Sequence, residues 1–276
     1  MTALTRHTPT PTTPAGPALQ VRLVGNEIAK GLRLAWHRRG MIAMGAGLNL
    51  LTYLGINLFI GGGHVVTGLM TLTLPALLAV TVAQAVAVNG SGSLAEEING
   101  GTLEQTRLSP TSAYLQVIGR IAALAVEGLL AAAVLAAVLV AWFGLDYTGH
   151  AAALLPAALT LLDVLGYGLL ITALTLRVAS IGAITHVFNM VIMFFGGMLV
   201  PVTLFPGPIE TVSHLVPSAL GIQAFNATLV HGLGASWSAR TLPWLLVHTV
   251  VLAVAGLVAY GAALRRALRE GALSPR

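Results

Sequence analysis

The sequence has no Cys and very few charged residues. Without Cys, the chain cannot form a disulfide framework, a thiolate nucleophile or a thiolate metal site. Only 8% of its 276 residues are charged, whereas about a quarter of the residues are charged in an ordinary soluble domain. A hydrophobic fraction of 56% and a mean hydropathy of +0.87 therefore predict an integral membrane protein.

The chain also lacks the usual motifs for nucleotide and metal binding. Its one Lys, Lys30, is not preceded by the glycine-rich pattern of a phosphate-binding loop, G-x-x-x-x-G-K-[ST]. The eight His never form the H-E-x-x-H spacing that places two zinc ligands on one helix face. The Gly-Ser stretch 90–93 has no His or acid placed to activate a Ser, so we interpret it as a flexible helix end. We expect no catalytic residue, cofactor or metal on this chain.

Long apolar runs dominate the sequence. Most are near or above the ~20 residues that a helix needs to cross a membrane. They predict an all-α protein with six transmembrane helices in a single domain, residues 21–276. The expected spans are 41–60, 65–88, 112–142, 151–176, 181–200 and 242–264.

The net charge of +5 could indicate a nucleic-acid partner, but the basic residues cluster beside the ends of the apolar runs. This distribution is typical of the positive-inside rule, so we expect membrane lipid as a partner and no nucleic acid. Six spans place both termini on one side. Assigning that side to the cytoplasm leaves only Arg240 outside, which predicts a multi-pass protein of the cell membrane.

The N-terminal part has two sections. Residues 1–20 are rich in Thr and Pro and lack an apolar core long enough for a signal sequence, so we expect a disordered cytoplasmic tail. Residues 21–39 place apolar side chains at helical spacing opposite a basic face that includes Lys30. This pattern favours an amphipathic helix lying flat at the membrane interface over a helix packed on a soluble domain.

Two acids fall inside the predicted spans. Glu127 lies in the third and Asp163 in the fourth, at a depth where an ionised group is expensive. Each could line a translocation path or bind a cationic substrate. Each could equally be a hydrogen-bonded carboxyl that locks helices together. Arg120 lies seven residues before Glu127, so a direct ion pair between them is not assured.

The stretch between Pro201 and Thr241 is too long for a tight turn and still apolar. Several Pro residues would break any long helix there. We expect a re-entrant pair of short helices in the outer leaflet rather than a plain extracellular loop, since irregular backbone at membrane depth must be sheltered by protein or a cavity.

The segment 96–110 is a polar island between two apolar runs, and it holds three of the nine acids of the chain. Two Gly permit a sharp change of direction, and Thr102 and Gln105 have capping-box spacing. Ser109 is expected to cap the third span, with Pro110 at its first helical position. These features predict a short helix across the cytoplasmic side.

The pattern E-x-x-x-G-T-L-E followed by S-P resembles the permease subunit of type-2 ABC exporters. This resemblance implies a coupling helix that docks on a cytoplasmic ATPase, and a working unit of two permeases and two ATPases, with ATP and Mg on the ATPases. Asn99 stands where many members have an acid. The coupling residues implied by the resemblance and the polar segment are Glu96, Glu97, Gly101, Thr102, Leu103, Glu104, Ser109 and Pro110.

The resulting functional hypothesis is a homodimeric exporter subunit for an amphipathic or apolar substrate such as a drug, small peptide or lipid-like molecule. The residues expected to line or gate the path are polar, Met or Phe side chains within the spans. They are Asn49, Asn57, Glu127, Asp163, Asn189, Met193 and Phe194. The same residue types also serve simple helix packing.

Three alternatives remain open from the sequence. A secondary transporter could be driven by protons through Glu127 and Asp163, the cargo could be a lipid-linked glycan, or the chain could be a membrane scaffold that transports nothing. The acidic cluster at 96–110 could likewise be a solvated loop that keeps a hairpin inside.

Overall fold

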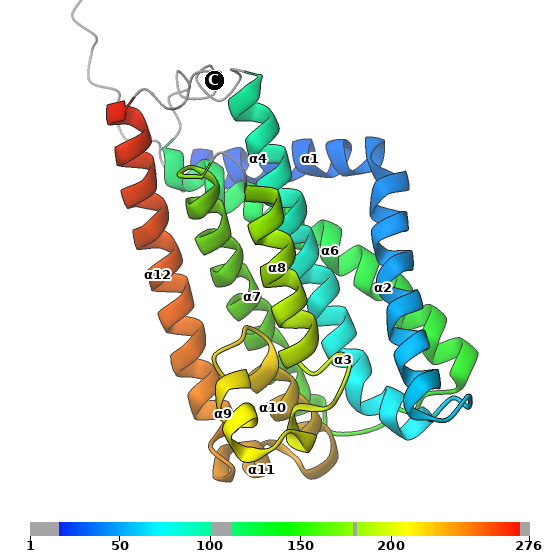
Figure 1. The fold of residues 1–276 in the computed structure, drawn as a ribbon. Helices are drawn as coiled ribbons and strands as arrows, with labels where there is room; N and C mark the ends of the chain where they lie inside the picture. Colours follow the sequence, from blue (N-terminus) through cyan, green and yellow to red (C-terminus); the bar gives the residue numbers. More distant parts are fainter. Residues whose placement is uncertain (1–16, 101–111, 179–180, 271–276) are drawn as a thin grey trace, which may run out of the picture.

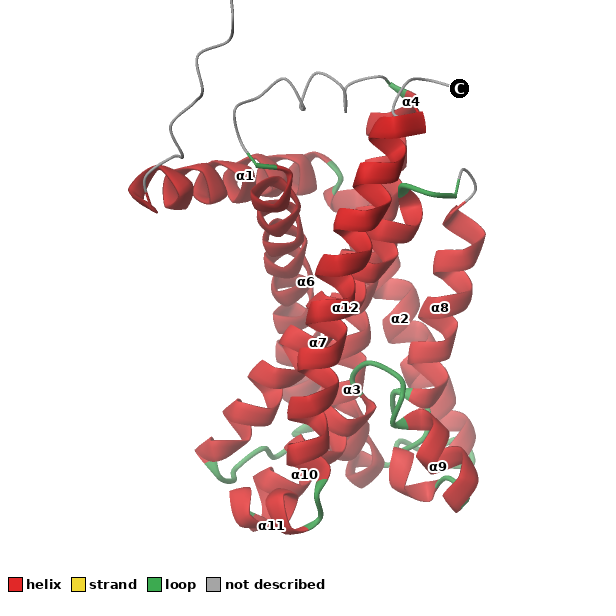
Figure 2. Ribbon diagram, turned by 90° about the vertical axis from the view of Figure 1, so that its left-hand side faces the viewer, coloured by secondary structure: helices red, strands yellow, loops and turns green. Residues whose placement is uncertain are grey.

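A computed structural model describes residues 17–100, 112–178 and 181–270, and these are helices joined by short connections, with no strand among them (Figures 1 and 2). The bundle confirms the all-α prediction. The tail, apart from residues 17–20, and the part of the polar segment from 101 to 110 lie outside the described residues.

Five helices within the described ranges are long and apolar enough to cross a membrane. Four of them are single elements: α2 (Arg39–Ile60), α6 (Ala113–Phe143), α7 (Leu154–Thr175) and α12 (Thr241–Glu270). The fifth is a continuous helix, Thr67–Asn99, built from α3 (Thr67–Gln84), the π-helical turn η1 (Ala85–Asn89) and α4 (Gly90–Asn99). The Gly-Ser stretch 90–93, expected as a flexible end, is thus the first turn of α4.

The run expected as the fifth span is shorter than predicted. It forms α8 (Ile181–Phe195), an apolar helix of 15 residues, which is below the ~20 residues needed to span a bilayer. Gly197 follows with a φ of 89°, a left-handed conformation that ends the helix there. The structure therefore supports five of the six expected spans.

The helix expected over residues 21–39 is α1 (Pro17–His37), which lies across one end of the bundle (Figure 1). The ends of α4 and α12 lie at the same end, here called the α1 end. A Cβ added to Gly31 of α1 would lie 2.4 Å from the Cβ of Ala123 in α6. The two helices can approach this closely because both residues are small.

α7 and α12 pack together through two further glycines. A Cβ at Gly166 would lie 2.9 Å from the backbone N of Ala253, and a Cβ at Gly256 would lie 2.8 Å from the carbonyl O of Gly166. Any side chain at these positions would push the helices apart, so the glycines set the distance between α7 and α12.

Short helices occupy the opposite end of the bundle, here called the α9 end. They are η2 (Ala151–Ala153), η3 (Val202–Leu204), α9 (Gly207–Ser213), α10 (Ala219–His231) and α11 (Leu233–Ser238). The stretch expected as a re-entrant pair therefore contains several short helices, of which α10 packs against α7: a Cβ at Gly221 would lie 1.9 Å from Oγ1 of Thr160. The depth of these helices in a membrane remains a prediction.

Candidate functional site

The helix Thr67–Asn99 is longer than a membrane requires. Its 33 residues correspond to about 50 Å of helix, against roughly 30 Å for the hydrocarbon core. Its last turns, α4, extend to the α1 end of the bundle (Figure 1). Glu96 and Asn99 are exposed on this tip. The tip leads directly into residues 101–110, which carry the remaining predicted coupling residues.

One acid of the tip is held against the bundle. Glu97 forms an ion pair with Arg120 of α6, and both side chains are only about a quarter exposed. Arg120 therefore pairs with Glu97 across two helices, a partnership that the sequence did not reveal because 23 residues separate the two. Of the two described coupling acids, Glu96 is the one whose side chain faces outward.

The residue that caps α6 differs from the predicted one. α6 begins at Ala113, and its N-cap is Ser112, whose Oγ accepts a hydrogen bond from the backbone N of Leu115 at 3.2 Å. We expected Ser109 to cap this span. The capping residue is the right type, since a Ser oxygen satisfies a free N–H of the first turn, but it lies three residues later.

Glu127 is buried beside the π-helical turn. Its side chain is 6% exposed, and its Oε1 accepts a hydrogen bond from Nδ2 of Asn89 at 2.9 Å. A second polar pair lies nearby, in which Nδ2 of Asn49 donates to Oε1 of Gln84 at 2.6 Å. Gln84 and Glu127 line the same small cavity of about 70 Å³ between α2, α3 and α6.

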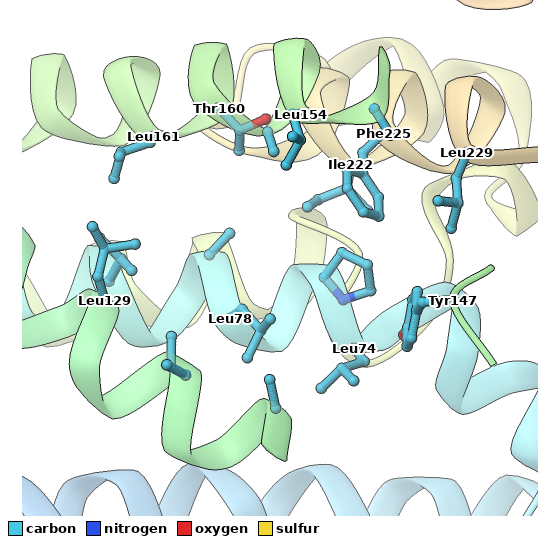
Figure 3. A pocket seen from close by; sticks show the side chains of 18 of the residues that line it. Leu74, Leu78, Leu129, Tyr147, Leu154, Thr160, Leu161, Ile222, Phe225 and Leu229 are labelled. Carbon is cyan, nitrogen blue, oxygen red and sulfur yellow. The ribbon is translucent and has the colours of Figure 1, made fainter. Parts of the chain in front are cut away.

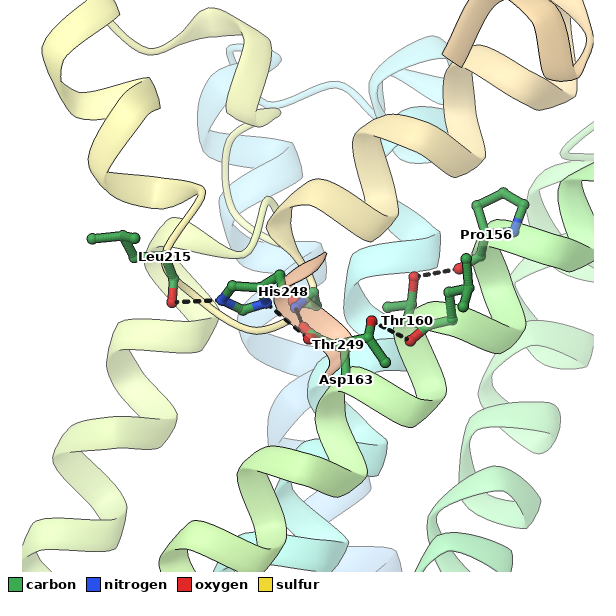
Figure 4. A network of polar contacts seen from close by, with 8 residues as sticks. Pro156, Thr160, Asp163, Leu215, His248 and Thr249 are labelled. Carbon is green, nitrogen blue, oxygen red and sulfur yellow. Dashed lines mark hydrogen bonds and ion pairs between the residues drawn. The ribbon is translucent and has the colours of Figure 1, made fainter. Parts of the chain in front are cut away.

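Asp163 is the centre of a buried polar network (Figure 4). Its side chain is 1% exposed, and its Oδ1 lies 2.8 Å from Nδ1 of His248 in α12. Its Oδ2 accepts a hydrogen bond from the backbone N of Ser218 at 3.3 Å, while Nε2 of His248 lies 3.3 Å from the carbonyl O of Leu215. The network joins α7, α12 and the α9–α10 connection.

The network also constrains where protons lie. All three contacts are satisfied when Nε2 of His248 donates to the carbonyl O of Leu215, which can only accept, and a proton lies between Nδ1 and the carboxyl group of Asp163. No local pattern in the sequence indicates this partnership, because 85 residues separate Asp163 from His248.

The other predicted path residues lie in different places. Asn57 is buried, and its side chain bonds the backbone of Val66, accepting from N at 3.0 Å and donating to O at 3.4 Å. With Asn49, it holds α2 against the start and end of α3. Met193 is half-buried against the core, whereas Phe194 is 53% exposed. The structure does not bring the seven residues together into one site.

Two buried polar atoms near α8 have no hydrogen-bond partner among the described residues: Oδ1 of Asn189 in α8 and the hydroxyl of Tyr167 in α7. The Tyr167 ring contacts the ring of Phe188 edge-to-face, with centroids 6.3 Å apart. The outward face of α8 is apolar and exposed at Phe188, Met190 and Phe194. Within a membrane, such an apolar face contacts either lipid or a second subunit.

No group of three His, Asp or Glu side chains that could hold a metal ion occurs among the described residues. The polar sites of this chain therefore consist of hydrogen-bonded pairs and small networks, each linking two or three helices. They can stabilise helix arrangements and hold protons, and the exposed tip of α4 can contact a partner.

Comparison with known families gives one match. The family model described as ABC-2 family transporter protein matches residues 48–265, which is most of the chain and includes α3, α4, α6 and α7. None of the curated proteins compared with the chain matches it.

Proposed function

The chain belongs to the ABC-2 transporter family, and from that premise we propose that it is the membrane-spanning subunit of an ATP-driven exporter. As a member of this family it is a multi-pass membrane permease and a transport component rather than a catalytic one. A separate cytoplasmic ATPase, with its own ATP and Mg, supplies the energy.

The observation that carries the proposal is the overlong helix Thr67–Asn99. Its tip projects at the end of the bundle where α1 also lies, and it presents Glu96 to the outside. Every Lys and Arg that the structure describes, except Arg240, lies in α1 or in or next to the start of α2 or α6 or the end of α7 or α12. That distribution favours the cytoplasm for this end, where an ATPase can reach the 96–110 segment.

The second copy of the chain is proposed to cover α2 and α8. The apolar stretch of α2 is only 17% buried, against 61% for the helix Thr67–Asn99, and α8 carries the exposed apolar face already described. A dimer formed there would cover the exposed side chains of Phe188, Met190 and Phe194. It would create a path with apolar walls and a few polar groups, which suits an amphipathic or apolar substrate.

ATP binding would close two ATPases on each other and move the two α4 tips. Because α4 continues into α3 as one helix, such a movement changes the packing of the spans. It thereby shifts the equilibrium between inward-open and outward-open states, provided that the ATPases bind those states with different affinities.

The proposal can be tested by co-expressing the chain with a soluble ATPase that carries a phosphate-binding loop, provided that the adjoining reading frame encodes one. The variant Glu96→Arg, combined with Glu104→Arg, should reduce co-purification of the ATPase and lower the permease-stimulated ATP hydrolysis. The matched control is Asp146→Arg, the same charge reversal at an exposed acid on the α9 end. If the double variant and the control behave like the wild type in both assays, the coupling proposal is wrong.

A proton-driven transporter is the second candidate, because Asp163 and His248 form a pair of ionisable side chains inside the bundle. The two mechanisms predict different energy sources. Export that stops on ATP depletion but persists after collapse of the proton gradient supports the ABC mechanism, and the opposite result supports the proton-driven one.

A further inference from the structure

An apolar cavity of about 670 Å³ lies within one copy of the chain, between α3, α6, α7 and α10 (Figure 3). Its walls follow α6 from Leu129 to Val140 and α7, with η2, from Ala151 to Val164. At 1.5 Å per residue, the α7 wall is about 20 Å long. The cavity is therefore an elongated slot that runs along the helices.

The slot exists because α6 and α7 diverge toward the α9 end (Figures 1 and 2) and because small residues face the gap. Ala132, Ala133 and Ala136 line it from α6, and Ala153 and Ala157 line it from the other side. Methyl groups are too small to fill the space between two diverging helices, so the gap remains.

The loop between α6 and α7 keeps the slot from collapsing. The backbone N of His150 donates to the carbonyl O of Leu229 in α10 at 3.1 Å, and the hydroxyl of Tyr147 donates to the carbonyl O of Thr71 in α3 at 2.8 Å. These bonds attach the α6–α7 loop to α10 and α3 at the α9 end of the slot. They thereby fix the distance between α6 and α7 at that end.

The interior of the slot offers no free hydrogen-bonding side chain. Oγ1 of Thr160 donates to the carbonyl O of Pro156 at 2.6 Å, and the hydroxyl of Tyr147 is already bonded. The rest of the described lining is apolar apart from His150 at one end. A cavity of this kind stays free of water and binds hydrocarbon, because water would find no partners there.

The slot opens sideways. Leu129 of α6 and Leu154 of α7 both line it, yet they are 43% and 73% exposed, so the mouth lies between these two helices. Both belong to helices that can cross a membrane, and the mouth therefore faces lipid rather than water. His150, exposed and at the α9 end of the slot, is the one basic side chain of the described lining.

We propose that this slot binds one acyl chain of a membrane lipid from the leaflet at the α9 end, with the polar part of the lipid next to His150. One leaflet contributes roughly 15 Å of hydrocarbon, close to the length of the slot. The volume falls within the ~300–1,000 Å³ of typical ligand pockets. The mouth opens toward lipid, which is always present there, so an acyl chain fits better than a transported cargo. The inference does not depend on ATP-driven export.

The test uses the full chain, without any ATPase, in phosphatidylcholine vesicles that contain a fraction of lipid with a diazirine in mid-chain. After irradiation, mass spectrometry of the peptides locates the crosslinks. The wild type should be labelled on the lining residues of α6 and α7. Ala136→Phe fills the slot and should lower this labelling by roughly tenfold, whereas Ala137→Phe, at an exposed residue outside the lining, should not.

A second pair of variants guards against a folding defect in the first. Ala157→Phe fills the slot from α7, and Ala158→Phe is its exposed control outside the lining. Equal labelling of a filled variant and its control overturns the proposal. Labelling of the lining that appears only after an apolar cargo is added also overturns it, because the slot would then be a cargo site. Loss of export with the lipid labelling intact would concern the proposed function alone.

Discussion

The buried pair of Asp163 and His248 allows a sharp test of what the intramembrane acid does. In His248→Leu, the carboxylate of Asp163, which is 1% exposed, keeps only the 3.3 Å bond from Ser218 N. Removing one member of a buried charged pair costs roughly 3–5 kcal/mol, because the other charge is left without its partner. Replacing both members by Leu removes that uncompensated charge, and such double replacements are often close to neutral.

The double-mutant cycle of these variants should therefore give a coupling free energy of about 3 kcal/mol or more. The assay is unfolding by SDS in mixed micelles, followed by the fluorescence of the four Trp residues. Thr249→Val is the control on the same helix, since the hydrogen bond of Thr249 to Leu159 is long, at 3.4 Å, and its loss should cost about 1 kcal/mol or less.

The reasoning fails if His248→Leu costs no more than Thr249→Val, or if the losses of the two single variants simply add in the double variant. Either result would mean that the contact between Asp163 and His248 contributes little to the stability of the folded state. If the cycle shows that the pair stabilises the fold and the double variant still exports, the role of the network is structural. If the double variant is stable but no longer exports, the network is needed for transport.

Three more variants test the packing of the helices. Gly166→Val should destabilise the protein by roughly 1–3 kcal/mol, because its side chain would push α12 away from α7; SDS unfolding measures this, and Gly55→Val, with no atom within 4 Å of an added Cβ, should be much milder. Arg120→Ala should increase hydrogen exchange in α4, because it removes the ion pair with Glu97. The double variant Arg120→Glu with Glu97→Arg, which swaps the two charges, should restore the protection. Ser218→Gly should stabilise the protein by about 1 kcal/mol, because Ser218 has a φ of 83° that costs a non-Gly residue energy; a higher unfolding midpoint, absent in Ser218→Ala, would confirm this.

The spans could be predicted from the sequence because the bilayer sets both their length and their composition. The predicted run 41–60 forms most of α2, Arg39–Ile60, and the run 242–264 forms the larger, first part of α12, Thr241–Glu270. The thickness of the bilayer and its apolar interior explain this agreement, rather than the helix propensity of individual residues. Helix ends were less predictable, since they depend on single residues such as the Ser112 cap.

Tertiary packing explains the main failures. Gly and Ser have low helix propensity, yet the stretch 90–93 is helical because it packs inside the bundle: a Cβ at Gly90 would lie 2.9 Å from Leu124. The partners of Asp163 and Glu97 come from distant parts of the chain, which no local pattern encodes. The slot arises from the angle between α6 and α7, and alanine-rich runs alone could not predict that angle.

The π-helical turn is a point at which the long helix can bend. A π-turn interrupts the regular i→i−4 bonding of an α-helix and is a place where helices bend. The helix Thr67–Asn99 is therefore two stiff arms joined at Ala85–Asn89. One arm ends at the exposed Glu96, and the other contributes Leu74, Leu78 and Val82 to the wall of the slot.

The bond from Asn89 to Glu127, 2.9 Å long, ties this joint to α6. We expect bending at this joint to change the angle between α3 and α6, which form two walls of the slot, and with it the volume available to an acyl chain.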